Sequence, residues 1–316
     1  MAYVGTEAHH LLVVEEANPG NAALCLSLSQ PADVMPGTAT CGPFGESGVY
    51  TTSSGKTIQG TRGPFPAAFG GISYQKTIGN SDYNALEVTV RHNAGPLELL
   101  AGYTYSKSID QSSNLAEAVN PLNPLLDRAP SAFDMTQNFV ASYRYAIPLA
   151  RTRLQAVFGG WEISGITRFS TGFPVTLFNN DDTSLLGTIP NGINNDGVDT
   201  PNYTPGSLRL NRSPRNGEPA FNTALFSLPA LGQIGTAARR FFYGPGIANF
   251  DMALAKKLCF GESRTLQLRV EAFNVWNHAQ FDGPAAVNGN IGSSNFGQIT
   301  SAAAPRLVQL AMKFSF

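Results

Sequence analysis

The side chains of this chain that could do chemistry are few, and their spacing fits no complete catalytic site. The most suggestive group is the segment Asn194–Asp199, NNDGVD, which gathers side-chain oxygens around a glycine. Such oxygens are the ligands that Ca²⁺ prefers, so Asn194, Asp196 and Asp199 are candidate metal ligands. The spacing is not that of an EF-hand loop, because no glutamate follows at the required position. The same residues also favour ordinary Asx and glycine turns, which is the simpler interpretation.

Two other patterns resemble sites but lack essential parts. Ser54–Thr57 ends like a phosphate-binding loop, yet the glycine expected five residues before Gly55 is replaced by Tyr50. The pair His9–His10 and the distant His278 have no third metal ligand at a useful spacing. The sequence contains no Ser/His/Asp or Cys/His set and no nucleophile elbow. It therefore predicts neither an enzyme nor a bound cofactor.

Most other charged side chains of interest lie near the centres of segments in which polar and apolar residues alternate. Successive side chains of a β-strand point to opposite faces, so each such segment has one polar and one apolar face. The charged residues expected on the polar faces are Glu87, Arg144, Glu162, Arg168, Arg269 and Glu271. Structural ion pairs between strands are their simpler role. The alternative is that some of them line a path for a solute.

Eight segments show the alternation and are predicted strands. They cover residues 2–15, 83–92, 97–108, 137–147, 161–170, 250–260, 264–276 and 307–316. The apolar faces are tall and end in aromatic residues, like a lipid-facing band between aromatic girdles. Segments of about 10–13 residues also suit a tilted membrane crossing, whereas strands of soluble proteins are typically about 5–6 residues long. The last strand closes the chain on an aromatic residue, Phe316, as bacterial outer-membrane barrels do.

The predicted connections alternate in length. They are short at 93–96 and 261–263 and moderate at 148–160, but long at 109–136, 171–249 and 277–304. This sorting is typical of outer-membrane barrels, which have short periplasmic turns and long extracellular loops.

Composition excludes several other classes of protein. Charged residues make up 14% of the 316 residues, against roughly a quarter in soluble domains, and the net charge of −1 offers no basic field for nucleic acid. The mean hydropathy is −0.08, and no apolar run approaches the ~18–20 residues of a membrane-spanning helix. A spanning barrel remains compatible with these values, because alternation dilutes its hydropathy.

The three cysteines bear on the compartment. Cys25 and Cys41 lie in one Gly/Pro/Ser-rich segment, and a disulfide between them would suit an oxidising environment. Cys259 is expected to be a buried or lipid-facing small apolar residue.

Several motifs are distributed along the chain. They are Tyr83–Leu86, Tyr103–Asp110, Gly160–Ile166, Ser170–Pro174, Tyr243–Gly246, Asn249–Asp251, and Arg269–His278 followed by Phe281. Together they resemble the barrel of TonB-dependent receptors of the Oar-like group, which bear a carboxypeptidase regulatory domain. The resemblance runs from about Ala2 to Phe316.

The resemblance implies an all-β, antiparallel transmembrane β-barrel of about 22 strands in the cell outer membrane, plugged by an amino-terminal domain. Residues 1–316 would supply about eight carboxy-terminal strands, with the plug domain and signal peptide absent from this chain. In the full-length parent, energised TonB would move the plug and admit an unidentified solute, and the loops 16–80, 171–249 and 277–304 would form part of the vestibule. The implied partners are outer-membrane lipid, the barrel-assembly machinery through the last strand and Phe316, the plug, TonB and the solute, but no nucleic acid.

Two alternatives remain open from the sequence. One is an autonomous small outer-membrane barrel with a structural or adhesive role, because eight strands suffice for a small barrel. The other is a soluble β-sandwich that binds carbohydrate.

Overall fold

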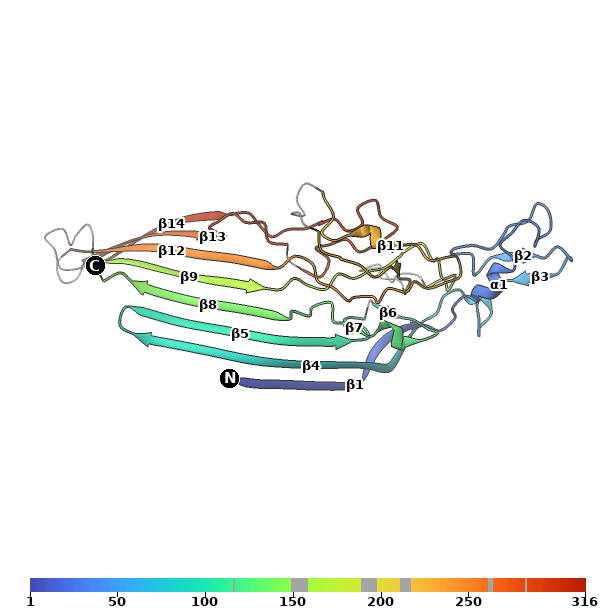
Figure 1. Cartoon of the computed structure of the whole chain (residues 1–316), viewed down its shortest axis with the longest axis horizontal. Helices are drawn as coiled ribbons and strands as arrows, with labels where there is room; N and C mark the ends of the chain where they lie inside the picture. Colours follow the sequence, from blue (N-terminus) through green and yellow to red (C-terminus); the bar gives the residue numbers. More distant parts are fainter. Residues whose placement is uncertain (116, 149–158, 189–197, 211–216, 261–263, 282) are drawn as a thin grey trace.

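The computed structural model describes residues 1–115, 117–148, 159–188, 198–210, 217–260, 264–281 and 283–316. Within these residues the dominant feature is one curved sheet of long strands (Figure 1). Its long strands are β1 (Ala2–Glu16), β4 (Ser73–Ala94), β5 (Leu97–Asp110), β8 (Gln137–Ala146), β9 (Trp161–Ser170), β12 (Ile247–Phe260), β13 (Arg264–Phe273) and β14 (Leu307–Ser315). Each of them overlaps one of the segments predicted from the alternation of polar and apolar residues.

The remaining elements are short and lie in the long connections. They are α1 (Ala22–Leu26), β2 (Val49–Thr51), β3 (Thr57–Gln59), η1 (Ala67–Phe69), β6 (Ala118–Val119), η2 (Pro124–Asp127), β7 (Ala129–Pro130), β10 (Asn202–Tyr203), η3 (Thr223–Leu225) and β11 (Phe226–Ser227). Among the described residues, no helix has the length and apolar character needed to cross a membrane.

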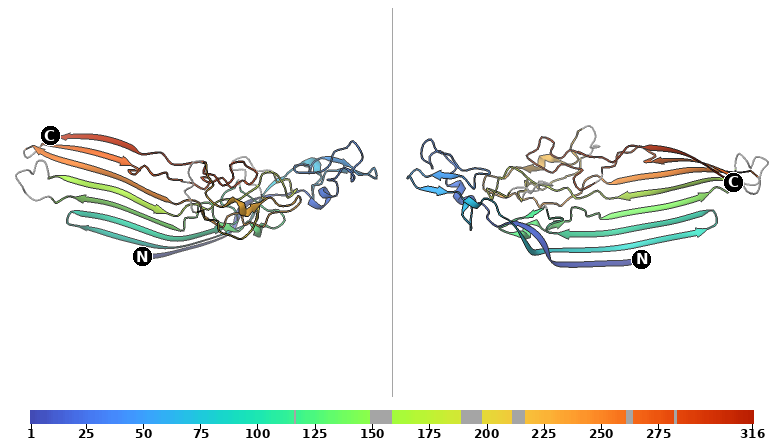
Figure 2. Two further views of the ribbon diagram at one scale, coloured as in Figure 1. Left: turned by 45° about the horizontal axis from the view of Figure 1, so that its top comes forward. Right: turned by 180° about the vertical axis from the view of Figure 1, so that it is seen from behind.

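The long strands pair in an order that follows the chain, β14-β13-β12-β9-β8-β5-β4-β1, and each of these pairs is antiparallel. The eight long strands are thus antiparallel, as expected, and the two-residue strand β6 from a long connection pairs with the end of β1 in parallel, Val14 with Ala118. The described sheet is not closed into a barrel, since β14 lies at one edge and β1, with β6 beside its end, lies at the other (Figure 2).

The register places most of the apolar strand residues on a single face. Leu86 pairs with Tyr105, and Leu268 pairs with Met312, so the apolar sets of successive strands are continuous. Within the described chain this face is not covered by other elements: Leu268 is 40% exposed and Met312 is 74% exposed. Exposed apolar surface on this scale marks an interaction surface rather than a solvated face.

The connections sort to the two ends of the sheet, as expected. Residues 95–96, 147–160 and 261–263 connect strands at one end, whereas residues 17–72, 111–136, 171–246 and 274–306 connect them at the other. The described parts of the four long connections fold together beyond the sheet, and the first connection projects furthest, with α1, β2 and β3 at its tip (Figure 1).

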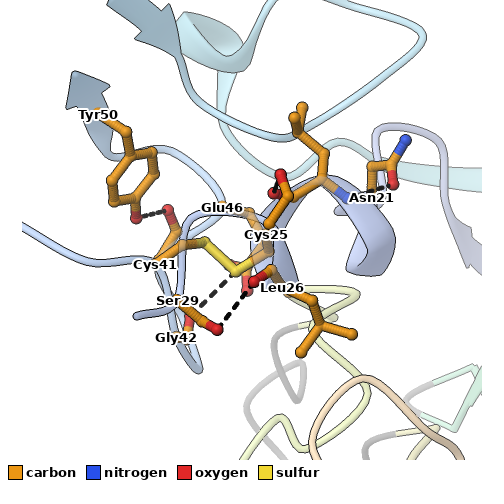
Figure 3. Close-up of a disulfide and its surroundings, with 12 residues drawn as sticks. Asn21, Cys25, Leu26, Ser29, Cys41, Gly42, Glu46 and Tyr50 are labelled. Atoms are coloured by element: carbon orange, nitrogen blue, oxygen red, sulfur yellow. Dashed lines mark hydrogen bonds between the residues drawn. A yellow bond between two sulfur atoms is a disulfide. The ribbon is translucent and has the colours of Figure 1, made fainter. Parts of the chain in front are cut away.

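The first connection, residues 17–72, has a small core of its own and is called the disulfide lobe below. Cys25 and Cys41 form a disulfide, with their Cα atoms 5.3 Å apart (Figure 3). Asn21 caps α1 by accepting a hydrogen bond from the Leu24 N–H at 3.0 Å, and Tyr50 donates to the Gly45 carbonyl. Short side-chain and disulfide anchors of this kind are needed where few residues are available for a core.

A second core lies among the other loops and is strongly aromatic. Its rings interact edge-on or tilted, with Phe221 against Phe242 at 4.9 Å and Phe241 against Phe242 at 5.1 Å between ring centroids. Phe226 and Phe296 join the same cluster, and such aromatic pairs stabilise beyond the area that they bury. The loops therefore have a fixed structure on which a site could be built.

Some strand boundaries differ from the prediction. β4 begins at Ser73 rather than at residue 83, because its first part pairs with the end of β1 in a polar stretch where the alternation is lost; there Lys76 contacts Glu15 at 2.6 Å. β13 ends at Phe273 rather than at residue 276, because Asn274 adopts a left-handed conformation, with φ 51°, that ends the strand.

Candidate functional site

The six charged residues expected on polar faces all lie on one face of the sheet. Glu98 pairs with Arg144, and Arg144 pairs with Ser164, which fixes a common face for β5, β8 and β9. From there the face continues through Ala253, which pairs with both Ser164 and Glu271. Strand alternation then assigns the same face to Glu87, Glu162, Arg168 and Arg269.

Ion pairs lie on this face, both between strands and within one strand. Arg144 contacts Glu98 at 3.0 Å and Glu162 at 2.7 Å, so one guanidinium joins three neighbouring strands. On β13, Arg269 contacts Glu271 at 2.6 Å. The Arg144 and Glu98 side chains are each 53% exposed, and ion pairs this exposed contribute less than about 1 kcal/mol to stability. They suit a wet surface better than a packed core.

The same face is hollowed. A depression of about 660 Å³ lies over the middle of the sheet, and its lining includes Arg91, Arg144, Arg269, Glu98, Asp251 and Glu271. Charges of both signs are interspersed there, so the hollow has no strong preference for cations or anions.

Two residues depart from the simple division of faces. Lys256 lies on the apolar face opposite Trp161, where its ammonium stands 5.1 Å from the Trp161 ring centroid and donates to the Gly159 carbonyl. The long side chain thus keeps its charge near polar atoms at the short-turn end. The expectation for Cys259 is wrong: it is exposed and pairs with Thr265 on the polar face.

At the loop end, two consecutive arginines enter a buried ionic cluster that the sequence analysis missed. Arg239 contacts Glu117 at 3.0 Å and also binds Asp127, while Arg240 binds Glu117 and lies 3.5 Å from Asp110. Burial raises the pKa of Glu117, but the two guanidinium groups outweigh it and hold that pKa at about 2. Only the RR dipeptide could have signalled this cluster, and its partners lie more than a hundred residues away in the sequence.

A second polar contact joins the disulfide lobe to connection 171–246. Asp182 accepts hydrogen bonds from the backbone N–H groups of Phe44 at 2.8 Å and Gly187 at 2.9 Å. Burial and the adjacent carboxyl of Glu46 raise the pKa of Asp182 to about 7. Leu185, from the same connection, is fully buried in the core of the lobe.

The metal candidates are not brought together by the described residues. Asp199 is buried and accepts hydrogen bonds from the Ser184 N–H at 2.9 Å and the Thr183 hydroxyl at 3.3 Å. Asn194 and Asp196 lie outside the described residues, so their role stays a prediction. Within the described part of the chain, no group of three or more His, Cys, Asp or Glu residues is arranged to hold a metal ion.

The other patterns noted in the sequence take ordinary structural positions. Residues 54–56 turn between β2 and β3, and Thr57 begins strand β3 rather than a helix. His9 shares a hydrogen bond with Asn80 at 2.9 Å, and the imidazole of His278 lies 3.2 Å from the Gln280 amide nitrogen.

A comparison with known protein families agrees with this architecture. The family model described as "Outer membrane beta barrel domain" matches residues 1–309. The chain belongs to this family. This outer membrane beta barrel domain therefore lies in the outer membrane, in a lipid environment.

Among solved structures, the domain is similar to the outer membrane transporter YddB from Escherichia coli. The similarity has a TM-score of 0.40 and 9% sequence identity, and it covers 99% of this chain and 30% of the transporter. The chain thus spans less than a third of the length of that protein. No curated protein matches the chain.

Proposed function

We propose that this outer membrane beta barrel domain is the carboxy-terminal part of the barrel of a TonB-dependent receptor of the Oar-like group, and that the full-length protein takes up a solute in an energised step. The observation that carries the proposal is the division of the sheet into an uncovered apolar face and a hollowed, charged face. A barrel built this way keeps lipid outside and a wet interior.

The polar face is the proposed interior. Glu87, Arg144, Glu162, Arg168, Arg269 and Glu271 would then face the lumen, where they would form ion pairs such as Arg144–Glu162 and Arg269–Glu271 and contact a plug domain. Charge is tolerated in a wet lumen, whereas an arginine on the lipid face at the midplane costs about 2–4 kcal/mol. The role is transport rather than catalysis, in keeping with the lack of a catalytic set in the sequence.

The two edges of the sheet support a larger barrel. Unpaired strand edges are not stable in hydrocarbon, because each free N–H and C=O group there costs several kcal/mol. Within the described sheet, β14 pairs only with β13, and most of β1 pairs only with β4. Further strands of the parent protein would pair with both edges. The edge strand β14 would contact the barrel-assembly machinery.

The test is to characterise the native protein in its own outer membrane. An antibody against the disulfide lobe, used on outer-membrane fractions, is expected to detect a heat-modifiable band well above the 33.6 kDa of this chain. Formaldehyde cross-linking followed by immunoprecipitation is expected to recover TonB with that band.

Two results would overturn the proposal. A heat-modifiable band at 33.6 kDa would instead indicate an autonomous small barrel with a structural or adhesive role. A long product that never cross-links to TonB, under conditions in which another TonB-dependent receptor of the same cells does, would exclude energised uptake.

A further inference from the structure

A pocket of about 580 Å³ opens among three of the long connections, beyond the loop end of the sheet. Its walls come from Ser113 and Phe133 in the connection 111–136, from Phe178 in the connection 171–246, and from Asn288 in the connection 274–306. The volume lies within the range of about 300–1,000 Å³ that is typical of small-molecule sites.

Phe133 is the most exposed large apolar side chain in this lining. Phe133 is 57% exposed. Hydrogen bonds nevertheless hold both ends of the turn that carries it. Asp134 donates its N–H to the Ser131 carbonyl at 2.8 Å, and Ser131 in turn donates its N–H to the Ser108 carbonyl at 3.0 Å. The Asp134 carboxylate accepts from the Ser108 N–H at 2.6 Å and binds the Lys107 ammonium at 3.1 Å.

An aromatic ring held in solvent by buried neighbours on both sides is a preorganised contact surface. Ser131 is fully buried and Asp134 is 2% exposed, so the turn loses little freedom when a ligand contacts the ring between them. Among the described residues, packing leaves more than half of the Phe133 surface uncovered.

The opposite wall is equally fixed. Gly289 lies so close to connection 171–246 that a Cβ there would come within 1.6 Å of the Thr176 carbonyl oxygen. Phe178 donates its N–H to the Gly289 carbonyl at 3.1 Å and accepts from the Ile291 N–H at 3.0 Å. This wall of the pocket is therefore held in place by backbone contacts within the chain.

The charges at the back of the pocket cancel one another. Among the described lining residues, the charged side chains are Arg240 and Glu117, and they bind each other in the buried cluster. The rest of the lining consists of aromatic and aliphatic side chains with a few uncharged polar groups. Thr300 donates its hydroxyl hydrogen to the Ala285 carbonyl and Asn288 donates one amide hydrogen to Ser293, so Thr300 can still accept and Asn288 can still donate a hydrogen bond. An anionic metal chelate or a peptide terminus would need an uncommitted opposite charge, which these residues do not supply.

We propose that this pocket binds a neutral saccharide, with the apolar face of one sugar ring against Phe133 and its hydroxyls hydrogen-bonded to the polar lining. A sugar combines an apolar ring face with uncharged donors and acceptors, which matches this lining.

Phe133 also lines a second pocket, of about 300 Å³, over the polar face of β4, β5 and β8, beside Glu87, Thr104 and Asn138. Its side chain thus borders both the outer pocket and the proposed barrel interior. This inward route rests on the proposed transport function, whereas the binding of saccharide does not.

Binding is measured by titration calorimetry on the native protein, extracted from its outer membrane in detergent. The probes are maltotriose, cellotriose and sucrose, with sulfated maltotriose and ferric citrate as anionic comparisons. At least one neutral saccharide is expected to bind, and Phe133→Ala is expected to weaken its binding at least tenfold. Phe133→Trp, which keeps a ring, is expected to retain most of the affinity.

The matched control is Phe65→Ala, which removes a similarly exposed ring (46%) from the disulfide lobe and should leave binding unchanged. Unaltered heat-modifiable migration of Phe133→Ala shows that the barrel is intact. The inference is overturned if no neutral saccharide binds, if the anionic probes bind better, or if Phe133→Ala binds as tightly as the parent protein. Failure of the TonB cross-link, by contrast, would leave saccharide binding untouched.

Discussion

Asp182 accepts a hydrogen bond from the backbone N–H of Phe44 at 2.8 Å, although the two residues are 138 positions apart in the sequence. This bond joins the disulfide lobe to the connection between β9 and β12. Around it lie the carboxyls of Glu46 and Asp199 and the guanidinium of Arg62, which contacts Glu46 at 3.7 Å. The projecting lobe is thus attached to the rest of the loops by a polar contact that contains a titratable group.

The first prediction is that this attachment weakens as the pH rises. The pKa of Asp182 is about 7, against 3.8 in an unstructured chain, so between these values the folded protein holds a proton that the unfolded chain has released. Stability then falls as the pH rises from about 4 towards 7. Hydrogen exchange at the Phe44 and Gly187 amides, corrected for intrinsic rates, should show more opening at pH 8 than at pH 5.

The matched substitution is Asp182→Asn, which should flatten this pH dependence because the side chain no longer titrates. Asp33→Asn, also an acidic-to-amide change but within the disulfide lobe, should preserve it. Equal pH dependence in the parent and in Asp182→Asn would contradict the assignment.

The second prediction concerns Leu185, which is fully buried in the core of the disulfide lobe. Leu185→Ala leaves a cavity, and such changes typically cost about 2–5 kcal/mol. The loss should appear as faster hydrogen exchange in residues 20–60 without any change in the strands of the sheet. Leu231→Ala, which truncates a 39% exposed leucine in the same connection, is the control and should change little.

The third prediction is that the Cys25–Cys41 disulfide stabilises the lobe locally. Closing a loop of this length removes about 3 kcal/mol of chain entropy from the unfolded state. The double change Cys25→Ser and Cys41→Ser should therefore increase exchange in the β2–β3 hairpin. Heat-modifiable migration of the barrel should remain as in the parent protein; a loss of barrel assembly would show that the lobe is needed for folding of the whole chain.

The fourth prediction contrasts a buried with an exposed ion pair. Glu117→Ala leaves Arg239 and Arg240 without their shared partner in a buried site, at a cost of about 3–5 kcal/mol. Limited trypsin digestion should then cleave after these arginines, which are 2% and 1% exposed in the parent protein. Glu98→Ala, which breaks only the exposed pair with Arg144, should leave the digestion pattern unchanged.

The fifth prediction tests which face meets lipid. Leu268 pairs with Met312 on the apolar face, whereas Gln267 pairs with Lys313 on the polar face. Leu268→Arg should lower the folding yield in lipid vesicles, since a charge near the midplane costs about 2–4 kcal/mol, while Gln267→Arg should be tolerated. Comparable yields for the two variants would contradict the assignment of the faces.

The alternation of polar and apolar residues along each strand explains how much of the fold could be predicted. Side chains alternate along a strand whatever its partner is, so the eight strand segments and the common face of residues such as Glu87 and Arg269 follow from the sequence alone. The predicted strand boundaries are wrong where the alternation stops. The first part of β4 is polar on both faces, and the end of β13 depends on the backbone conformation of a single residue, Asn274.

At the loop end of the sheet, by contrast, the contacts could not be predicted from the sequence. The RR dipeptide at 239–240 carries no sign that its partners are Glu117 and Asp127, and nothing near Phe133 signals that its ring will stand between two pockets. Contacts of this kind depend on how four long connections fold against one another. Because no repeating backbone pattern governs those connections, only the tertiary structure decided them, whereas the sequence by itself determined the strands, their two faces and the sorting of the loops.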